Sequence, residues 1–486
     1  MNQNKVTNAT KWSAFAEIVA KLVTPIVNMI LARLLSPTEF GVVASITIVT
    51  SFADIFTDAG FQRFIIQHEY EKEENLNFDS DVSFSANLIM STIIWMIIAI
   101  FRHKLAVAVG CPEASTGLAI AALAVICTSF SSVLLGRFRR NLEFKSIFFI
   151  RIGSAFVPLV ITVPLAFWLK SYWALIIGTL AQQLFTALVA LIISKWKPHI
   201  KLDGKRFRAM FAFSAWNLCE TISIWFAGQA NIFIVGALMS SNEVGLYKIG
   251  MSTINSYTSI ITASLTPVLF AALSRLQNIK EEYNATFDHF QRMMATIIFP
   301  ICGGVFMYRY LAVGILLGNN WMKIADFMGL WALCSSITIT YSNTACEVYR
   351  SYGLPKVSFI LQIIYLIMYV PAIYLSARNG FSALCLVSCL IRIFPVAMDL
   401  IVLDCRFKIK LKECINNTII PIVVTTITCV FAFALRVVSN NIIWEVISAV
   451  ICAFVYLGIS WKIPSQKEFI SGLVNMGKRQ KNIDEQ

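Results

Sequence analysis

Residues 34–46 read LLSPTEFGVVASI, and residues 238–250 read LMSSNEVGLYKIG. Four residues recur in register 204 positions apart, namely Leu34 with Leu238, Ser36 with Ser240, Glu39 with Glu243 and Gly41 with Gly245. Each copy is a short polar break between two long apolar runs. A break that recurs at one spacing suggests an internal repeat, and its meaning depends on what the apolar runs are.

The apolar runs are typical of membrane-spanning helices. Hydrophobic residues make up 57% of the 486 residues and charged residues only 14%, whereas soluble domains carry about 25% charged residues. A helix needs about 20 apolar residues to cross a bilayer. We therefore predict an all-α, polytopic membrane protein with about fourteen transmembrane helices. The predicted spans are 12–35, 40–65, 82–101, 117–136, 147–169, 172–194, 209–238, 243–274, 290–317, 324–349, 357–376, 380–403, 417–436 and 442–461.

Lysine and arginine are concentrated in alternate loops, which predicts the orientation. The loops after even-numbered spans and both termini carry most of these cations, as in RFRRNLEF at residues 137–144 and in the segment 195–208. Since cytoplasmic loops are enriched in Lys and Arg, both termini are predicted to be cytoplasmic and Cys111 to lie outside. The net charge of +13 then mostly reflects topology, and we expect no nucleic-acid partner. The alternative for the two basic segments is that they also attract anionic headgroups.

The repeated break predicts how the spans are grouped. The two copies are the first and seventh connections, so six spans separate them and both enter the membrane in the same direction. The same offset places Trp12 over Trp216. We predict two six-helix lobes, 1–204 and 205–408, related by a pseudo-twofold axis along the membrane normal, plus a helix pair and tail in 409–486. The alternative is chance similarity between two Ser/Glu/Gly turns.

Motifs of enzymes and metal sites are missing from the sequence. It has no G-x-x-x-x-G-K-[ST], no H-E-x-x-H and no C-x-x-C, and it has only four histidines. The 12 cysteines lie mostly inside apolar runs, so no disulfide framework is implied. We expect no enzymatic activity, no cofactor and no metal.

Several segments resemble the polysaccharide-exporter branch of the multidrug/oligosaccharidyl-lipid/polysaccharide exporter superfamily, and the chain looks like an oligosaccharide flippase of the colanic-acid and O-antigen type. The segments are KWSAFAEIVAKLV, ILARLLSPTEFGVVA, FADIFTDAGFQRFIIQ, RFRRNLEF, FSAWNLCETISIWFAGQANIFIVGAL and PVLFAALSRLQ, over most of residues 1–410. The resemblance implies a V-shaped, two-lobed transporter in the bacterial inner membrane. Its implied substrate is an undecaprenyl-diphosphate-linked oligosaccharide, moved from the cytoplasmic to the periplasmic leaflet. Further implied partners are membrane lipids, a coupling proton or sodium ion, and the glycan polymerase machinery.

Ionisable residues inside spans are the candidate binding residues, because they are costly in a membrane and usually face a cavity or a partner. Glu17 and Lys21 lie four residues apart in the first span. Lys21 is a candidate ligand of the diphosphate, positioned by Glu17, and it aligns roughly with a cationic position in the related lipid II flippases. The alternative is an ion pair within one helix that only neutralises itself.

Candidate residues for ion coupling are carboxylates in the second and seventh spans. Asp54 and Asp58 lie four residues apart, and a carboxylate pair can share a proton or bind a cation. For Asp58 we favour an interfacial pair with Arg63. Glu220 interrupts the seventh span together with Gln229 and Asn231.

The second half offers further cations. Lys248 and Arg309 are placed in the outer part of their spans and are candidates for substrate binding in the outward-facing state. Four other charged residues are interpreted as interfacial or mutually paired, namely Glu347, Arg350, Arg392 and Asp399.

Two alternatives to a flippase remain. A cation-coupled multidrug exporter of the same superfamily would use a smaller, carboxylate-lined cavity. A membrane glycan polymerase normally needs a large outer loop with Arg or His, and the predicted outer loops are short.

Overall fold

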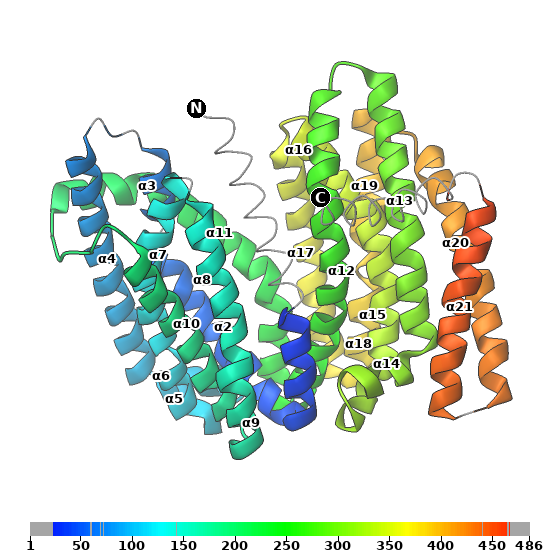
Figure 1. The fold of residues 1–486 in the computed structure, drawn as a ribbon, viewed down its shortest axis with the longest axis horizontal. Helices are drawn as coiled ribbons and strands as arrows, with labels where there is room; N and C mark the ends of the chain where they lie inside the picture. Colours follow the sequence, from blue (N-terminus) through cyan, green and yellow to red (C-terminus); the bar gives the residue numbers. More distant parts are fainter. Residues whose placement is uncertain are drawn as a thin grey trace, which may run out of the picture. The chain divides into compact units, whose positions relative to one another are not determined.

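The computed structural model describes residues 23–58, 61–68, 70, 72–141, 143–439, 441–463 and 466, and all regular elements in these residues are helical. By their internal contacts the residues form two compact units, Met1–Ile249 and Gly250–Gln486. The boundary falls within one long helix, α12 (Ser241–Arg275). Figure 1 shows the helices of each unit.

The first unit begins, in its described part, with a short apolar helix, Val23–Leu34. The elements that follow are α2 (Pro37–Asp58), α3 (Phe61–Gln67), α4 (Glu73–Ile100), α5 (Arg102–Ala108), η1 (Pro112–Ala114), α6 (Ser115–Ala121), α7 (Leu123–Arg140), α8 (Phe144–Val157), η2 (Pro158–Thr162), α9 (Val163–Leu169), α10 (Trp173–Ile193) and α11 (Gly204–Leu238).

The second unit continues from α12 with α13 (Lys280–Met307), α14 (Arg309–Leu316), η3 (Asn319–Ile324), α15 (Ala325–Thr338), η4 (Ile339–Asn343), α16 (Thr344–Ser351), α17 (Pro355–Arg378), α18 (Phe381–Leu390), α19 (Ile393–Val402), η5 (Leu403–Phe407), α20 (Leu411–Val438) and α21 (Ile442–Lys462). Helix α13 packs along α20, and α20 packs along α21 (Figure 1).

The described residues contain 12 helices that are long and apolar enough to cross a membrane. Two shorter apolar helices, Val23–Leu34 and Gly228–Leu238, lie where the first and seventh spans are predicted. Large apolar side chains such as Ile100 (75% exposed), Trp168 (79%) and Val437 (74%) point outward. Such surfaces suit contact with lipid rather than water, and the all-α, polytopic fold is confirmed.

The two copies of the repeated turn contact each other within the first unit. A Cβ on Gly41 would lie 1.6 Å from the carbonyl oxygen of Ser241, and a Cβ on Gly245 would lie 1.9 Å from that of Pro37. Gly41 of α2 therefore contacts Ser241, the first residue of α12, and Gly245 of α12 contacts Pro37, the first residue of α2. The amide of Asn242 also donates to the Thr38 hydroxyl over 3.3 Å, a pair exactly one repeat length apart in the chain.

Both copies start their helices in the same way. Glu39 accepts from the backbone N–H and the hydroxyl of Ser36. Glu243 accepts from the same two groups of Ser240, over 3.0 and 2.7 Å. A glutamate that accepts from the N–H before the helix is the carboxylate half of a capping box. At the second turn the Glu243 N–H also donates to the Ser240 hydroxyl over 3.4 Å, which is the other half. The recurrence of Ser and Glu thus has a structural cause at both turns.

The predicted halves 1–204 and 205–408 are defined by the spacing of the sequence repeat, whereas the two compact units are defined by which residues contact one another. Helix α11, the first helix of the predicted second half, packs against α2, α3 and α4, and Trp225 donates to the Ser51 hydroxyl over 3.0 Å. Helix α11 is accordingly part of the first unit, and the six-helix division stays a prediction.

Candidate functional site

A cavity of about 550 Å³ lies within the first unit, between the helix Val23–Leu34 and the elements α7, α8, η2 and α10. Helices α7 and α8 both pack against α10. Half of the residues that line the cavity are polar or charged: Thr24, Asn28, Arg139, Arg151, Ser154, Thr162, Thr179, Gln182 and Thr186. So many polar side chains between apolar spans indicate a place for a polar ligand.

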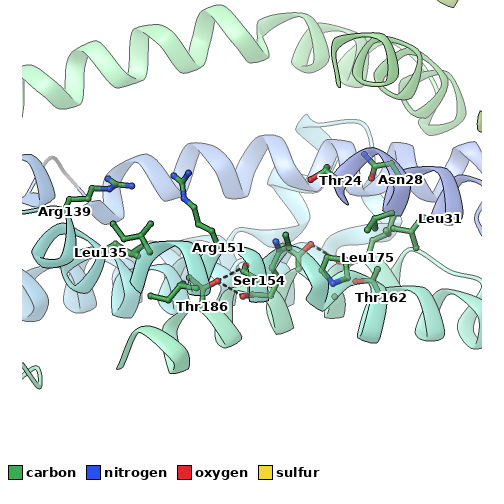
Figure 2. Close-up of a pocket in the computed structure, with 18 residues that line it drawn as sticks. Thr24, Asn28, Leu31, Leu135, Arg139, Arg151, Ser154, Thr162, Leu175 and Thr186 are labelled. Atoms are coloured by element: carbon green, nitrogen blue, oxygen red, sulfur yellow. Dashed lines mark hydrogen bonds between the residues drawn. The ribbon is translucent and has the colours of Figure 1, made fainter. Parts of the chain in front are cut away.

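Two arginines lie at one end of this cavity. Arg139 lies in the last turn of α7, and Arg151 lies in the second turn of α8. Figure 2 shows their guanidinium groups pointing to the same side of the cavity, with Thr24 and Asn28 toward its other end. Guanidinium groups bind phosphate through paired N–H donors at fixed geometry. This end is therefore suited to an anionic group.

The position of Arg139 is fixed by the short helix α3. Its Nη1 donates to Gln62 Oε1 over 2.9 Å, and Gln62 Nε2 donates to the carbonyl of Ser132 over 3.0 Å. Gly136 lets this side chain approach α7, because a Cβ there would lie 2.9 Å from Gln62 Cγ. The arginine is thus oriented by a side chain that is itself held.

Hydroxyl and amide groups line the cavity beside the arginines as well (Figure 2). The Thr186 hydroxyl donates to the backbone carbonyl of Gln182 over 2.9 Å and lies 3.0 Å from the Ser154 hydroxyl. Hydroxyls and carboxamides both donate and accept hydrogen bonds, which is what the hydroxyl groups of a sugar require. The cavity therefore combines phosphate-binding and sugar-binding chemistry.

The predicted binding residues lie elsewhere or outside the described residues. Glu17 and Lys21 fall in the part of the chain that the structure does not describe. Lys248 lies in the second turn of α12, half-buried, and is not among the residues that line the cavity. Arg309 pairs with Asp326, with 2.6 Å between Nε and Oδ1, and its guanidinium lies over the rings of Phe306 and Tyr310.

The predicted coupling carboxylates are on helices of the first unit. Asp54 is half-buried in α2, and Asp58 ends that helix with its side chain outside the described part. Glu220 lies on α11, where the structure describes the backbone alone. Their role in coupling stays a prediction.

The four charged residues interpreted as interfacial or paired have the following partners. Arg350 Nη1 lies 2.7 Å from Glu347 Oε1. The Arg392 guanidinium stacks 4.0 Å from the Trp331 ring. Asp399, 6% exposed, accepts from the Tyr349 hydroxyl over 3.0 Å. Arg392 and Asp399 therefore have different partners.

Arg151 was missed by the sequence analysis, although a signal was present. It lies four residues inside the predicted span 147–169, in the run FFIRIGSAF, and an arginine inside an apolar span is a candidate by the rule applied to Lys21. Arg139 lies in RFRRNLEF, whose cations were interpreted mostly as topology signals that can also attract anionic headgroups. That it meets Arg151 in one cavity depends on how α7 and α8 pack.

Other cations of the RFRRNLEF and 195–208 segments bind the protein itself. Lys201 pairs with Asp81 (2.9 Å) and Arg206 with Asp79 (2.7 Å), and both carboxylates are buried. Arg137 stacks 4.8 Å from the Trp196 ring. These contacts attach the segment between α10 and α11, together with the start of α11, to α4 and α7.

Comparison with known proteins gives consistent matches. A family model described as "Polysaccharide biosynthesis protein" matches residues 30–326. The succinoglycan biosynthesis transport protein ExoT of Rhizobium meliloti is 23% identical over 384 residues, which are 78% of this chain and 76% of that protein. The lipopolysaccharide biosynthesis protein WzxC of Escherichia coli is 18% identical over 379 residues, 77% of this chain and 76% of that one.

Among solved structures, the lipid II flippase MurJ in an inward closed conformation has a similar fold. The TM-score is 0.73 over 93% of this chain and 98% of that chain, at 12% identity. At this identity the likeness shows the fold and leaves the substrate open. The transport proteins among these matches agree with the expectation that the chain is a transporter and not an enzyme.

Proposed function

Because the chain belongs to the polysaccharide biosynthesis protein family, we propose that it is a flippase. Its substrate is an oligosaccharide linked to undecaprenyl diphosphate, which it moves from the cytoplasmic to the periplasmic leaflet of a bacterial inner membrane. Both termini are on the cytoplasmic side, and transport proceeds by alternating access. The relatives named for succinoglycan transport and lipopolysaccharide biosynthesis support this class of substrate.

The observation that carries the proposal is the cavity with two arginines and a polar wall inside a membrane unit. A diphosphate and a chain of sugars cannot cross hydrocarbon unaided, because each unpaired polar group costs several kcal/mol there. Arg139 and Arg151 offer cations for the phosphates, and the wall around Ser154, Gln182 and Thr186 offers partners for sugar hydroxyls. The cavity therefore lowers the free energy needed to move both the diphosphate and the sugars across the membrane.

The residues selected from the sequence complete the proposal. Lys21, Glu17, Lys248 and Arg309 contribute to substrate binding in one or another state of the cycle. Asp54 and Glu220 couple transport to a proton or sodium ion. A multidrug exporter would not need two arginines at one end of the cavity, because its typical substrates are themselves cationic or apolar.

Reconstituted transport tests the role of Arg151. The chain is placed in liposomes with a fluorescent lipid-linked oligosaccharide, and accessibility of the label to an impermeant quencher is followed on each side. Arg151→Gln should lower the transport rate by at least about tenfold, since one charge-assisted phosphate contact is lost. Arg151→Lys keeps a cation without the paired N–H geometry and should retain part of the rate.

The matched control is Arg102→Gln, because Arg102 is an exposed arginine of the same unit and does not line the cavity. It should transport as the unchanged protein does. Equal rates for Arg151→Gln and the unchanged protein, at equal reconstitution, would exclude Arg151 from substrate binding. Transport of a cationic dye in place of the glycan would favour the multidrug exporter.

A further inference from the structure

A second cavity, of about 250 Å³, lies within the second unit. Arg292 and Thr296 line it from α13, Asn416 and Asn417 from α20, and Gln466 from the segment that follows α21. It therefore lies where α20 starts and α21 has ended. None of its residues takes part in the function proposed above.

The arginine of this cavity is held through a neighbouring amide. Arg292 Nε donates to Asn417 Oδ1 over 2.9 Å. The amide nitrogen of Asn417 donates in turn to Asp288 Oδ1 over 2.6 Å and to Gln291 Oε1 over 3.1 Å. Both amide hydrogens of Asn417 are thus used, and its Oδ1 orients the guanidinium group of Arg292.

The terminal nitrogens of Arg292 remain available. Neither Nη1 nor Nη2 makes a hydrogen bond within the described part of the chain, and no carboxylate there lies within ion-pair distance of Arg292. Asp288 is one turn away on the same helix and binds Asn417. The paired donors that suit a phosphate are therefore presented at the cavity.

Gln466 provides a second and independent sign of a missing ligand. Its side chain is 2% exposed, and its Nε2 and Oε1 are both buried without a hydrogen-bond partner among the described residues. A buried carboxamide without partners is unfavourable, and this one lines the cavity. Its N–H suits a phosphate oxygen, and its carbonyl suits a hydroxyl or amino group beside that phosphate.

The outer surface of α20 indicates where such a ligand comes from. Ile415, Ile419 and Ile420 are 41%, 46% and 40% exposed, and Ile420 also lines the cavity. Lys410 and Lys412 are exposed just before and within the first turn of the same helix. Apolar side chains beside a cavity with lysines near the helix start match the border between lipid tails and headgroups.

We propose that this cavity binds the phosphate group of a membrane phospholipid headgroup, with Arg292 on the phosphate and Gln466 on the phosphate and its adjoining hydroxyl or amino group. The acyl chains lie along the exposed isoleucines of α20. The site is separate from the cavity of the first unit and binds a lipid that is not transported.

Binding of a fluorescent, short-chain phosphatidylglycerol to the purified full-length protein tests the site. The unchanged protein should bind it saturably. Arg292→Gln should weaken binding by about tenfold or more, and Arg292→Lys by less. Gln466→Leu should also weaken binding, and it leaves the contact between Arg292 and Asn417 in place, so its effect is separate from any change in folding.

The matched control is Arg275→Gln, which removes an exposed arginine of the same unit, at the end of α12. It should bind as the unchanged protein does. The proposal is overturned if Arg292→Gln and Gln466→Leu both bind normally, or if Arg275→Gln weakens binding equally. It is also overturned if uncharged diacylglycerol of the same chain length displaces the probe as well as phosphatidylglycerol does.

Competition with inorganic phosphate separates the two sources of the ligand group. Displacement of the probe by phosphate alone supports a site for phosphate in general, which a free anion can fill. Binding of phosphatidylglycerol that phosphate does not displace supports a site that requires the lipid. Because the assay measures binding and not transport, it stands or falls independently of the flippase proposal.

Discussion

Asp81 joins a loop to a helix through one buried carboxylate. Its Oδ1 accepts from the backbone N–H of His199 over 3.1 Å, and its Oδ2 lies 2.9 Å from Lys201 Nζ. The carboxylate side chain is 3% exposed, whereas Lys201 is 46% exposed. Loss of these contacts therefore costs more free energy at the buried Asp81 carboxylate than at the exposed Lys201, because Asp81 depends on these donors.

Asp81→Asn should destabilise the first unit. It removes the charge that strengthens both contacts, and hydrogen bonds to charged groups contribute about 1.5–3 kcal/mol each. Because Lys201 stays solvated, we expect a loss near the lower end, about 1–2 kcal/mol. Thermal unfolding in detergent measures it, with Glu74→Gln as the control because Glu74 is an exposed acid in the first turn of the same helix. Equal midpoints for both variants would show that the loop is held by other contacts.

At the scale of single residues, the sequence selected its candidates by a rule that takes no account of packing. The rule that ionisable residues inside spans are functional selected Lys248 and Arg309, but Arg309 is paired with Asp326. Arg309 and Asp326 are 17 positions apart in the chain and meet because α14 and α15 pack together. Arg139 and Arg151 lie 12 positions apart, and their shared cavity likewise depends on helix packing, which the apolar pattern does not specify.

Helices are the scale at which the sequence was most informative. Long apolar runs predicted the spans because a bilayer requires them. A helix in the structure starts earlier than its predicted span where polar turns precede the apolar run. The span predicted at 82–101 belongs to α4, which starts at Glu73. The extra turns carry Asp79 and Asp81, whose burial depends on cations from the 195–208 segment. A hydropathy pattern does not show such long-range pairs.

Local breaks inside spans had a visible cause. The predicted span 147–169 contains a π-helical turn, η2 (Pro158–Thr162), between α8 and α9. Proline lacks the N–H that continues an α-helix. Pro158 is the first residue of this turn, and Pro164 follows its last residue by two positions. This π-helical turn borders the cavity of the first unit, because Pro158 and Thr162 both line that cavity.

Gly41→Ala tests the contact between the two repeated turns. The added Cβ would lie 1.6 Å from the Ser241 carbonyl oxygen, so backbone must move, at a cost of about 1–3 kcal/mol or more. We expect a lower unfolding temperature and a lower yield of folded protein. Gly228→Ala is the control, because no atom lies within 4 Å of its added Cβ and alanine favours a helix interior by about 1 kcal/mol. If the Gly41→Ala protein is as stable as the unchanged one, the two turns can move apart without loss of folding free energy, which would contradict this prediction.

At the scale of the whole chain, the cations of alternate loops predict one orientation. Reporter fusions after Lys201 and after Gln486 should give cytoplasmic signals, and a fusion at Cys111 should give a periplasmic signal, because Lys and Arg are retained on the cytoplasmic side. Alkaline phosphatase and green fluorescent protein fusions measure the two sides. A cytoplasmic signal at Cys111 would contradict the orientation and the direction in which both repeated turns enter the membrane.

The contact between the two turns also bears on how such a chain arises. Gly41 meets the first residue of α12, and Gly245 meets the first residue of α2, each with its own capping glutamate. A surface on which each copy meets the equivalent atoms of the other is self-complementary, as in a twofold homodimer. An ancestral protein with one such turn could form this junction with an identical subunit, and gene duplication with fusion would then preserve it without any new sequence.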